Sequence, residues 1–255
     1  MSLKRIAFKY FPDPALRFVR AHHYQNQLKH YDINDEPDVL GCKALLCPGD
    51  IVLDIGANIG VYTRFCSEFV GPSGRVFALE PTPETFSYLT RNVRYLGLSN
   101  VVCYNLAASD QDNDHARMSL PSYTTGGTNL YEAALSDTGD IPVKTVRLDE
   151  LFRDLCPKFI KCDVEGHEVH CIHGALELIA RCRPIWMIEV LNPQVFEIFS
   201  SLDYEVFIWD QNGFRHSTPT DKRPNYFFSP KEIALTSGTA SPVKAAGAGH
   251  TVTRR

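Results

Sequence analysis

Three titratable side chains, Asp163, Glu165 and His167, fall within the five-residue segment DVEGH. A fourth, Glu189, ends an apolar run further along the chain. A carboxylate or imidazole held in position can remove the proton from an attacking hydroxyl group, so these four residues are the candidate catalytic bases. Structural roles are open as well. Asp163 could cap a helix or orient a cofactor, and Glu165 and His167 could lie on an exposed first helical turn.

The same acids could instead bind a divalent metal ion, because carboxylate oxygens are hard ligands. Asp163, Glu165 and Glu189 would be its ligands. The segment HEVH at 167–170 is not the H-E-x-x-H motif of zinc enzymes. We expect a site without metal.

The candidate bases follow short apolar runs bounded by turn residues, which predicts buried strands. Strands and helices alternate from residue 51 onward, so we expect an α/β fold with a mostly parallel sheet of seven strands flanked by helices. Ligands of such sheets lie beyond the carboxyl ends of the strands, where the bases are found. The strands are expected at 51–55, 75–80, 101–106, 159–166 with its following turn, 184–190, 204–210 and 225–230, and the helices at 59–70, 83–97, 149–155, 167–181 and 193–202.

The alternation breaks after the third strand, where residues 109–141 are rich in Ser, Thr, Asp, Gly and Asn. Apolar segments on either side predict a hairpin or lid in place of a helix. Its polar loop is long for a connector, which favours a function, although a plain hairpin tip would explain it nearly as well. Thr128 and Asn129 in this loop could contact a substrate, as could Asn192, which follows Glu189 closely.

The turn after the first strand reads DIGANIG. Backbone N–H groups of such a turn point at a ligand above the strand. Gly56 lets the backbone approach that ligand, and Gly60 lets the helix pack on the strand. Asp54 adds an acceptor, with Ala57 and Asn58 between the glycines. These groups suit a cofactor that carries both an ammonium and a carboxylate.

Two further acids follow the next strands. Glu80 lies 24 residues after Gly56, where a carboxylate can accept both hydroxyls of a ribose, although it could also be a solvated acid at a strand end. Asp110 could accept from an adenine amino group or simply form an Asx turn. The dinucleotide motif G-x-G-x-x-G and the P-loop motif are both missing from the sequence, which argues against NAD and nucleoside triphosphates.

The 255 residues divide by composition into three parts. Residues 1–47 are expected to be an N-terminal helical appendage, in which Leu16, Val19 and His23 could share one face of a short helix. Residues 48–235 form the α/β domain. Residues 236–255 are small, polar and aperiodic, which predicts a disordered tail.

A formal net charge of -4 disfavours a nucleic-acid partner. No run is long enough to span a membrane and no signal peptide is recognisable, so we expect a cytoplasmic protein. The eight cysteines include no C-x-x-C pair, and several lie in apolar runs, as free thiols do in a reducing compartment.

The segments DIGANIG, LEPTPETFSYLTRNV, NLAASD, FIKCDVEGHE and IEVLN together resemble the FkbM-type methyltransferases over about residues 50 to 230. The glycine turn indicates only a broad class, whereas DVEGHE is far more specific. The resemblance implies the Rossmann-like class I methyltransferase fold, S-adenosylmethionine as cofactor, and O-methylation of a sugar or polyketide hydroxyl. Two departures are the first 40 residues, which match no motif, and Cys162, which stands where the family has an aliphatic residue.

Other functions remain open at this point. A nucleic-acid N-methyltransferase would typically carry N/D-P-P-Y/F after the fourth strand, where this chain has DVEG. A protein N-methyltransferase and a protein that binds S-adenosylmethionine without turnover are further alternatives. The sequence does not identify the acceptor or the oligomeric state.

Overall fold

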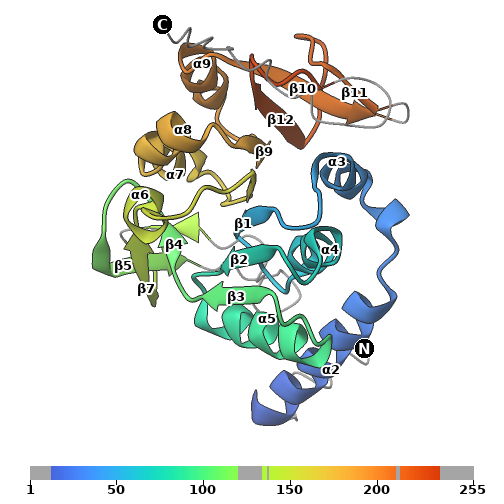
Figure 1. The fold of residues 1–255 in the computed structure, drawn as a ribbon. Helices are drawn as coiled ribbons and strands as arrows, with labels where there is room; N and C mark the ends of the chain where they lie inside the picture. The colour runs from blue at the N-terminus through green and yellow to red at the C-terminus, as the bar shows by residue number, and fades with distance from the viewer. Residues whose placement is uncertain (1–12, 120–133, 137, 211–212, 236–255) are drawn as a thin grey trace, which may run out of the picture.

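The fold is built on a central sheet with helices on both faces (Figure 1). A computed structural model describes residues 13–119, 134–136, 138–210 and 213–235. Over these residues the main sheet has eight strands in the order β11-β10-β12-β9-β8-β1-β2-β3. They are β1 (Ile51–Ile55), β2 (Arg75–Leu79), β3 (Val101–Tyr104), β8 (Phe159–Cys162), β9 (Ile185–Glu189), β10 (Tyr204–Asp210), β11 (Gly213–His216) and β12 (Asn225–Pro230).

The predicted mostly parallel sheet is confirmed. Strands β3, β2, β1, β8 and β9 pair in parallel, whereas β12 pairs antiparallel with both β9 and β10. All seven expected strands are present. The eighth, β11, was not predicted: it is a four-residue strand that pairs antiparallel with the end of β10, and so short a segment carries little periodicity.

Alternate side chains of each strand face opposite helical layers, as the two-residue period of a strand requires. On one face, Val52 and Val76 pack with residues of α3 (Pro37–Leu45) and α4 (Val61–Val70). On the other face, Leu53 and Phe77 join a larger cluster. That cluster includes residues of α6 (Leu148–Leu151), α7 (Glu168–His173), α8 (Leu176–Cys182) and α9 (Gln194–Ser201).

The helix expected over 167–181 is two helices, α7 and α8, with a break at Gly174. A Cβ on Gly174 would lie 1.9 Å from the carbonyl oxygen of Ser109. The chain therefore breaks where it must pass close to another backbone segment, a contact that no local pattern reveals.

The predicted insertion after the third strand is a separate small sheet (Figure 1). Its strands follow the order β4-β7-β5-β6, and β5 pairs antiparallel with β7. Thr128 and Asn129 lie outside the described residues. The four strands are β4 (Ala107–Ala108), β5 (Asn113–Ser119), β6 (Ala134–Leu135) and β7 (Ile141–Val146).

The N-terminal segment begins with α2 (Asp13–His30), which is longer than the short helix expected there. Between residues 17 and 30 of this helix, the buried side chains are Ala21 and Leu28, which pack with Tyr88 of α5 (Pro83–Tyr95). Val19, expected on the packed face, is 60% exposed. A 3-10 helix, η1 (Ile33–Asp35), leads into α3.

Helix α3 belongs to the core of the main domain, although the sequence placed it in the appendage. Cys42 is fully buried on the sheet, and a Cβ on Gly41 would lie 2.8 Å from the ring of Phe227. The proposed tail at 236–255 lies outside the described residues.

Two cysteines form a disulfide, which the sequence did not predict, because it contains no motif of paired cysteines. Cys156, after α6, is bonded to Cys182, at the end of α8. The other six cysteines, all among the described residues, are free. Among the helices that the structure describes, none is both long and apolar enough to cross a membrane.

Candidate active site

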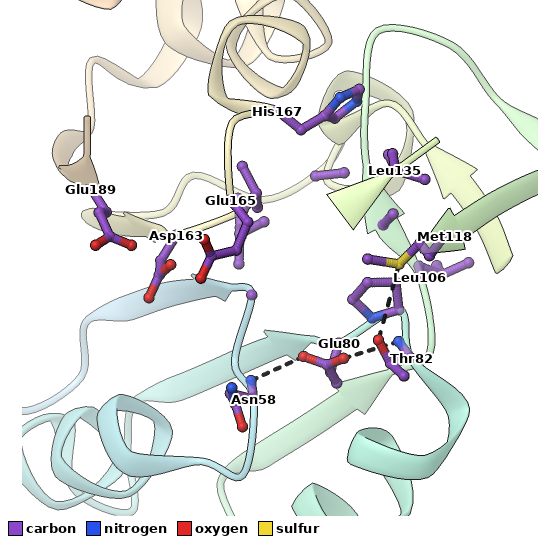
Figure 2. A pocket seen from close by; sticks show the side chains of 16 residues that line it. Asn58, Glu80, Thr82, Leu106, Met118, Leu135, Asp163, Glu165, His167 and Glu189 are labelled. Carbon is purple, nitrogen blue, oxygen red and sulfur yellow. Dashed lines mark hydrogen bonds between the residues drawn. The ribbon is translucent and has the colours of Figure 1, made fainter. Parts of the chain in front are cut away.

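A cavity opens beyond the carboxyl ends of β1, β2, β8 and β9, between the main sheet and the small sheet (Figure 2). This is the edge at which ligands of parallel sheets bind. Seven of the predicted site residues line it: Gly56, Asn58, Glu80, Asp163, Glu165, His167 and Glu189. The other described lining residues are Ile55, Pro81, Thr82, Leu106, Ala107, Ala108, Met118, Leu135 and Val164.

The glycine turn after β1 is tied to the end of β2. The backbone N–H groups of Gly56 and Ala57 both donate to the carbonyl oxygen of Leu79, over 3.0 and 2.9 Å. The N–H of Asn58 donates to Glu80 Oε2 over 3.1 Å. These three amides therefore fix the shape of the turn, which corrects the expectation that they point at a ligand.

The two glycines of this turn are needed for packing. Gly56 has φ +74°, and a Cβ there would lie 1.8 Å from the carbonyl oxygen of Asp163. Gly60 has φ +100°, and its Cβ would lie 2.9 Å from Leu89 Cδ1 in α5. Gly56 thus lets β1 and β8 converge at their carboxyl ends. Gly60 provides contact between helices, instead of the expected contact with the strand.

Asp54 is fully buried below the turn. Its Oδ2 accepts a hydrogen bond from the Thr63 hydroxyl over 2.5 Å, and Lys161 Nζ lies 3.7 Å from its Oδ1. Burial raises the pKa of Asp54, against the opposing effects of Lys161 and Thr63. Asp54 therefore supports the turn from beneath and is not part of the described cavity lining.

Glu80 lies at the cavity wall beyond the end of β2 and is 6% exposed. Burial raises its pKa to about 7, although hydrogen bonds from Thr82 and Asn58 lower it. The Thr82 N–H donates to Glu80 Oε1 over 2.9 Å. Asn105, not singled out from the sequence, donates from Nδ2 to the carbonyl oxygens of Glu80 and Pro81, over 2.8 Å each. Asn58 and Thr82 therefore fix the two oxygens of the carboxylate, and Asn105 fixes the backbone that carries it.

Three of the predicted bases converge on one side of the cavity (Figure 2). Oxygens of Asp163, Glu165 and Glu189 lie within 4.8 Å of one another. Burial, a hydrogen bond with Asp163 and the nearby charges of Asp163 and Glu165 raise the pKa of Glu189 to about 8. Burial also opposes ionisation of Asp163, but Lys161 and the hydrogen bond with Glu189 lower its pKa overall. Asp163 is therefore the carboxylate of the pair and Glu189 the protonated acid.

Lys161 is a further site residue that was not singled out from the sequence. It is 4% exposed, and its Nζ lies 3.1 Å from Asp163 Oδ2. The available signal was a lysine within the otherwise apolar strand FIKC, because a buried ammonium needs partners. The three carboxylates are close enough together to hold a metal ion, and Lys161 places an ammonium beside one of them.

The turn that carries Glu165 has an unusual backbone. Glu165 has φ +52° and Gly166 has φ +96°. The N–H of Gly166 donates to Glu168 Oε1 over 2.7 Å, and Glu168 is fully buried. This turn holds Glu165 at the cavity, which disfavours an exposed position on the first turn of a helix.

His167 lines the cavity apart from the three acids, on the side toward Leu135 (Figure 2). Its Nε2 is 2.9 Å from Ser109 Oγ, and its ring stacks on that of His170 at 4.5 Å. Burial, with the neighbouring His170, lowers the pKa of His167 to about 4. His167 is therefore neutral near pH 7, the form in which an imidazole can accept a proton.

Besides Asp54, Ala57 and Gly60 in and below the glycine turn, Asp110 and Asn192 also lie outside the described cavity lining. Asp110 Oδ2 is 2.9 Å from His170 Nδ1, and this bond lowers the pKa of Asp110. Asn192 Oδ1 accepts from the N–H of Gln194 over 3.0 Å, at the start of α9. Asn192 thus makes an Asx-type contact at the start of α9, whereas Asp110 pairs with His170 of α7, which lies far away in the sequence.

Residues 54–215 match the family model of the methyltransferase FkbM domain. The hexuronic acid methyltransferase AglP of Haloferax volcanii is 33% identical over 129 residues, which cover 49% of this chain and 49% of the relative. The 31-O-demethyl-FK506 methyltransferase FkbM of Streptomyces tacrolimicus is 29% identical over 158 residues, 51% of this chain and 60% of the relative. The chain thus spans less than two thirds of the length of either relative.

A solved structure, methyltransferase FkbM from Methylobacillus flagellatus KT, aligns with a TM-score of 0.48 and 18% identity, over 71% of this chain and 43% of that one. The family match covers the glycine turn after β1, Glu80 and all four predicted bases. The chain belongs to the FkbM family of methyltransferases.

Proposed function

We propose that this chain is an S-adenosylmethionine-dependent O-methyltransferase whose acceptor is a hydroxyl group of a glycan or another small molecule. The observation that carries the proposal is the position of Asp163, Glu165 and Glu189 across one cavity from Glu80 (Figure 2). A carboxylate on the nucleotide side and a group of acids on the opposite side suit a cofactor and a hydroxyl acceptor, respectively.

The cavity residues fit the cofactor. Asn58 Oδ1 is buried without a hydrogen-bond partner among the described residues, and Asn58 lines the cavity. Such an atom is rare unless a ligand or water satisfies it. Glu80 would bind the ribose hydroxyls, Asn58 would bind a polar group, and Leu106 and Met118 offer an apolar wall to the adenine. When bound, S-adenosylmethionine supplies a methyl group carried on a sulfonium.

The acids of this chain would prepare the acceptor. Asp163 is the ionised member of its pair with Glu189, so it can accept the proton of an acceptor hydroxyl. Glu189, protonated at neutral pH, can donate a hydrogen bond to a second acceptor oxygen. Glu165 would hold the acceptor in line, because positioning supplies much of the rate in such displacements.

Two observations support a hydroxyl acceptor. The names of two relatives specify methylation of a hexuronic acid and of an O-demethyl compound. The carboxylates at the cavity and the neutral imidazole of His167 are groups that can take up the proton that a hydroxyl loses during attack. Net charge -4 supports a small-molecule acceptor over nucleic acid.

Methyl transfer from labelled S-adenosylmethionine tests the proposal. The acceptors to compare are a hexuronic acid glycoside, a neutral hexose glycoside and a macrolide alcohol. At least one of them should become a methyl ether that carries the label, with Asp163→Asn as the inactive control. Label recovered only on nitrogen, in protein or in nucleic acid, would exclude O-methylation, and failure to bind S-adenosylmethionine would exclude the whole proposal.

A further inference from the structure

Lys161 brings a positive charge into the apolar interior of the main sheet. It precedes the last residue of β8 and pairs in register with Asp54 of β1. An isolated ammonium in such a place is strongly unfavourable unless charged and polar partners compensate it. The contacts of Lys161 therefore show what the chain gains by retaining it.

The Lys161 ammonium contacts both halves of the site. It donates a hydrogen bond to the carbonyl oxygen of Gly56 over 2.9 Å, in the turn after β1. It also forms an ion pair with Asp163 Oδ2 at 3.1 Å, in the turn after β8. Gly56 and Asp163 both line the cavity, whereas Lys161 lies behind them. One side chain thus connects the cofactor turn with the catalytic acids.

Acids at the carboxyl ends of four strands, β1, β2, β8 and β9, influence this ammonium. Asp54 on β1 is 3.7 Å from Nζ, and the Lys161 charge also lowers the pKa of Glu80, beyond β2, and of Glu189, on β9. The remaining groups that face the site are Asp163, Glu165 and Cys162 around the end of β8, together with the Tyr62 ring on α4, whose centroid is 5.3 Å from Nζ.

We propose that Lys161 is a positioning residue that sets the geometry of the cofactor turn through its bond to Gly56 and keeps Asp163 ionised through the ion pair between them. This proposal rests on the function proposed above. Lys161 acts through its neighbours, since it reaches the cavity only by way of the two residues it bonds.

Two consequences follow from removing the Lys161 charge. Without an opposite charge at 3.1 Å, Asp163 should titrate about 1–3 pH units higher, because nearby charges shift carboxyl pKa values by that amount. Without the bond to Gly56, the turn should relax and cofactor binding should weaken. Lys161 itself stays protonated: burial lowers its pKa, but the charges of Asp163 and Asp54 raise it by more.

The test uses Lys161→Gln, Lys161→Met and Lys161→Arg in the full chain. Calorimetry gives the dissociation constant of S-adenosylhomocysteine, which reports on the cofactor turn. NMR titration of the side-chain carboxyl groups gives their pKa values without any acceptor present. The Asp163 signal is identified by its loss in Asp163→Asn. In Lys161→Gln it should titrate about 1–3 units higher than in the wild type. Lys161→Arg should keep the wild-type titration.

The dissociation constant of S-adenosylhomocysteine reports on the contact of Lys161 with Gly56, whereas the titration reports on its ion pair with Asp163. We expect the dissociation constant to rise about tenfold in Lys161→Met and less in Lys161→Gln, which can still donate to Gly56. Lys158→Met makes the same chemical change at the opposite end of β8 and should leave both measurements unchanged. A folded Lys161→Gln protein with an unshifted Asp163 signal would overturn the proposal.

The wild-type titration keeps the test decisive if the variants do not fold. It should show Asp163 ionising below the usual range of aspartates and Glu189 above pH 7. The reverse order would also overturn the proposal. A wild-type protein that shows this order but transfers no methyl group would instead refute the proposed function, so the two failures are distinguishable.

Discussion

Glu80 accepts a hydrogen bond from the backbone N–H of Asn58 over 3.1 Å, so the acid beyond β2 holds the turn that follows β1. A ligand that bonds to Glu80 therefore also acts on the glycine turn. The two sequence motifs of the nucleotide side, 24 residues apart between Gly56 and Glu80, form one unit in the structure.

Glu80→Gln should weaken binding of S-adenosylmethionine about 10- to 100-fold, because a charge-assisted hydrogen bond is worth roughly 1.5–3 kcal/mol. Isothermal titration calorimetry at pH 8, above the pKa of about 7 for Glu80, gives the clearest contrast. Glu68→Gln, an exposed acid on α4, is the matched control. An unaltered dissociation constant in Glu80→Gln would refute the ribose assignment.

Gly56→Ala should destabilise the protein by about 2–4 kcal/mol, because the new Cβ meets the Asp163 carbonyl oxygen at 1.8 Å in a positive-φ backbone. Gly97→Ala is the control: its φ is +67°, and no heavy atom lies within 4 Å of the added Cβ. Urea denaturation should show a loss of only about 1 kcal/mol for Gly97→Ala. Equal losses would mean that backbone strain alone explains Gly56.

Asp163→Asn should lower kcat about 10²- to 10⁴-fold, the usual contribution of a general base. Glu165→Gln should also lose turnover while it retains cofactor binding, because Glu165 lines the acceptor side of the cavity. Initial rates with the best acceptor from the methyl-transfer assay measure both. Wild-type turnover in Asp163→Asn would remove Asp163 as the base and leave Glu165 as the candidate.

The contribution of Glu189 to the stability of the protein without ligands should fall as the pH rises from about 4.5 to about 8. Its pKa is about 8 in the folded protein and near 4.5 when unfolded, so unfolding releases a proton in this window. Below the window both states are protonated, and above it both are ionised. The Tm of Glu189→Gln should therefore decline less than that of the wild type between pH 5 and 8.5.

Differential scanning calorimetry at several pH values measures this difference. Glu177→Gln, on the exposed side of α8, is the control and should follow the wild-type curve. If Glu189→Gln and the wild type decline in parallel, Glu189 is ionised in the folded protein at neutral pH. The assignment of the proton within the Asp163–Glu189 pair would then be wrong.

The sequence predicted the parallel sheet and the edge at which the site forms, because strand periodicity and turn residues are local signals. The acids at the strand ends could be found for the same reason. The role of the glycine turn could not, because the partner of Gly56 is the Asp163 backbone, more than 100 residues away. The break at Gly174 likewise depends on Ser109, from a different part of the chain.

Asp110 and Lys161 illustrate the limit for charged side chains. The sequence placed Asp110 at the cofactor by its position after a strand, but its side chain is paired with His170. It gave no weight to Lys161, because Asp54, one of the acids that compensate this ammonium, lies on another strand. Which charges pair in the interior is decided by strand order, and strand order is not a local property.

The small sheet from β4 to β7 offers a route for engineering. It supplies Met118 and Leu135 to one wall of the cavity, whereas Gly56, Glu80 and Asp163 come from the main sheet. A graft of residues 107–146 from one family member into another would exchange that wall and retain the main-sheet residues. Chimeras of this kind that keep Met118, which we place beside the adenine, would show whether the rest of this wall selects the acceptor.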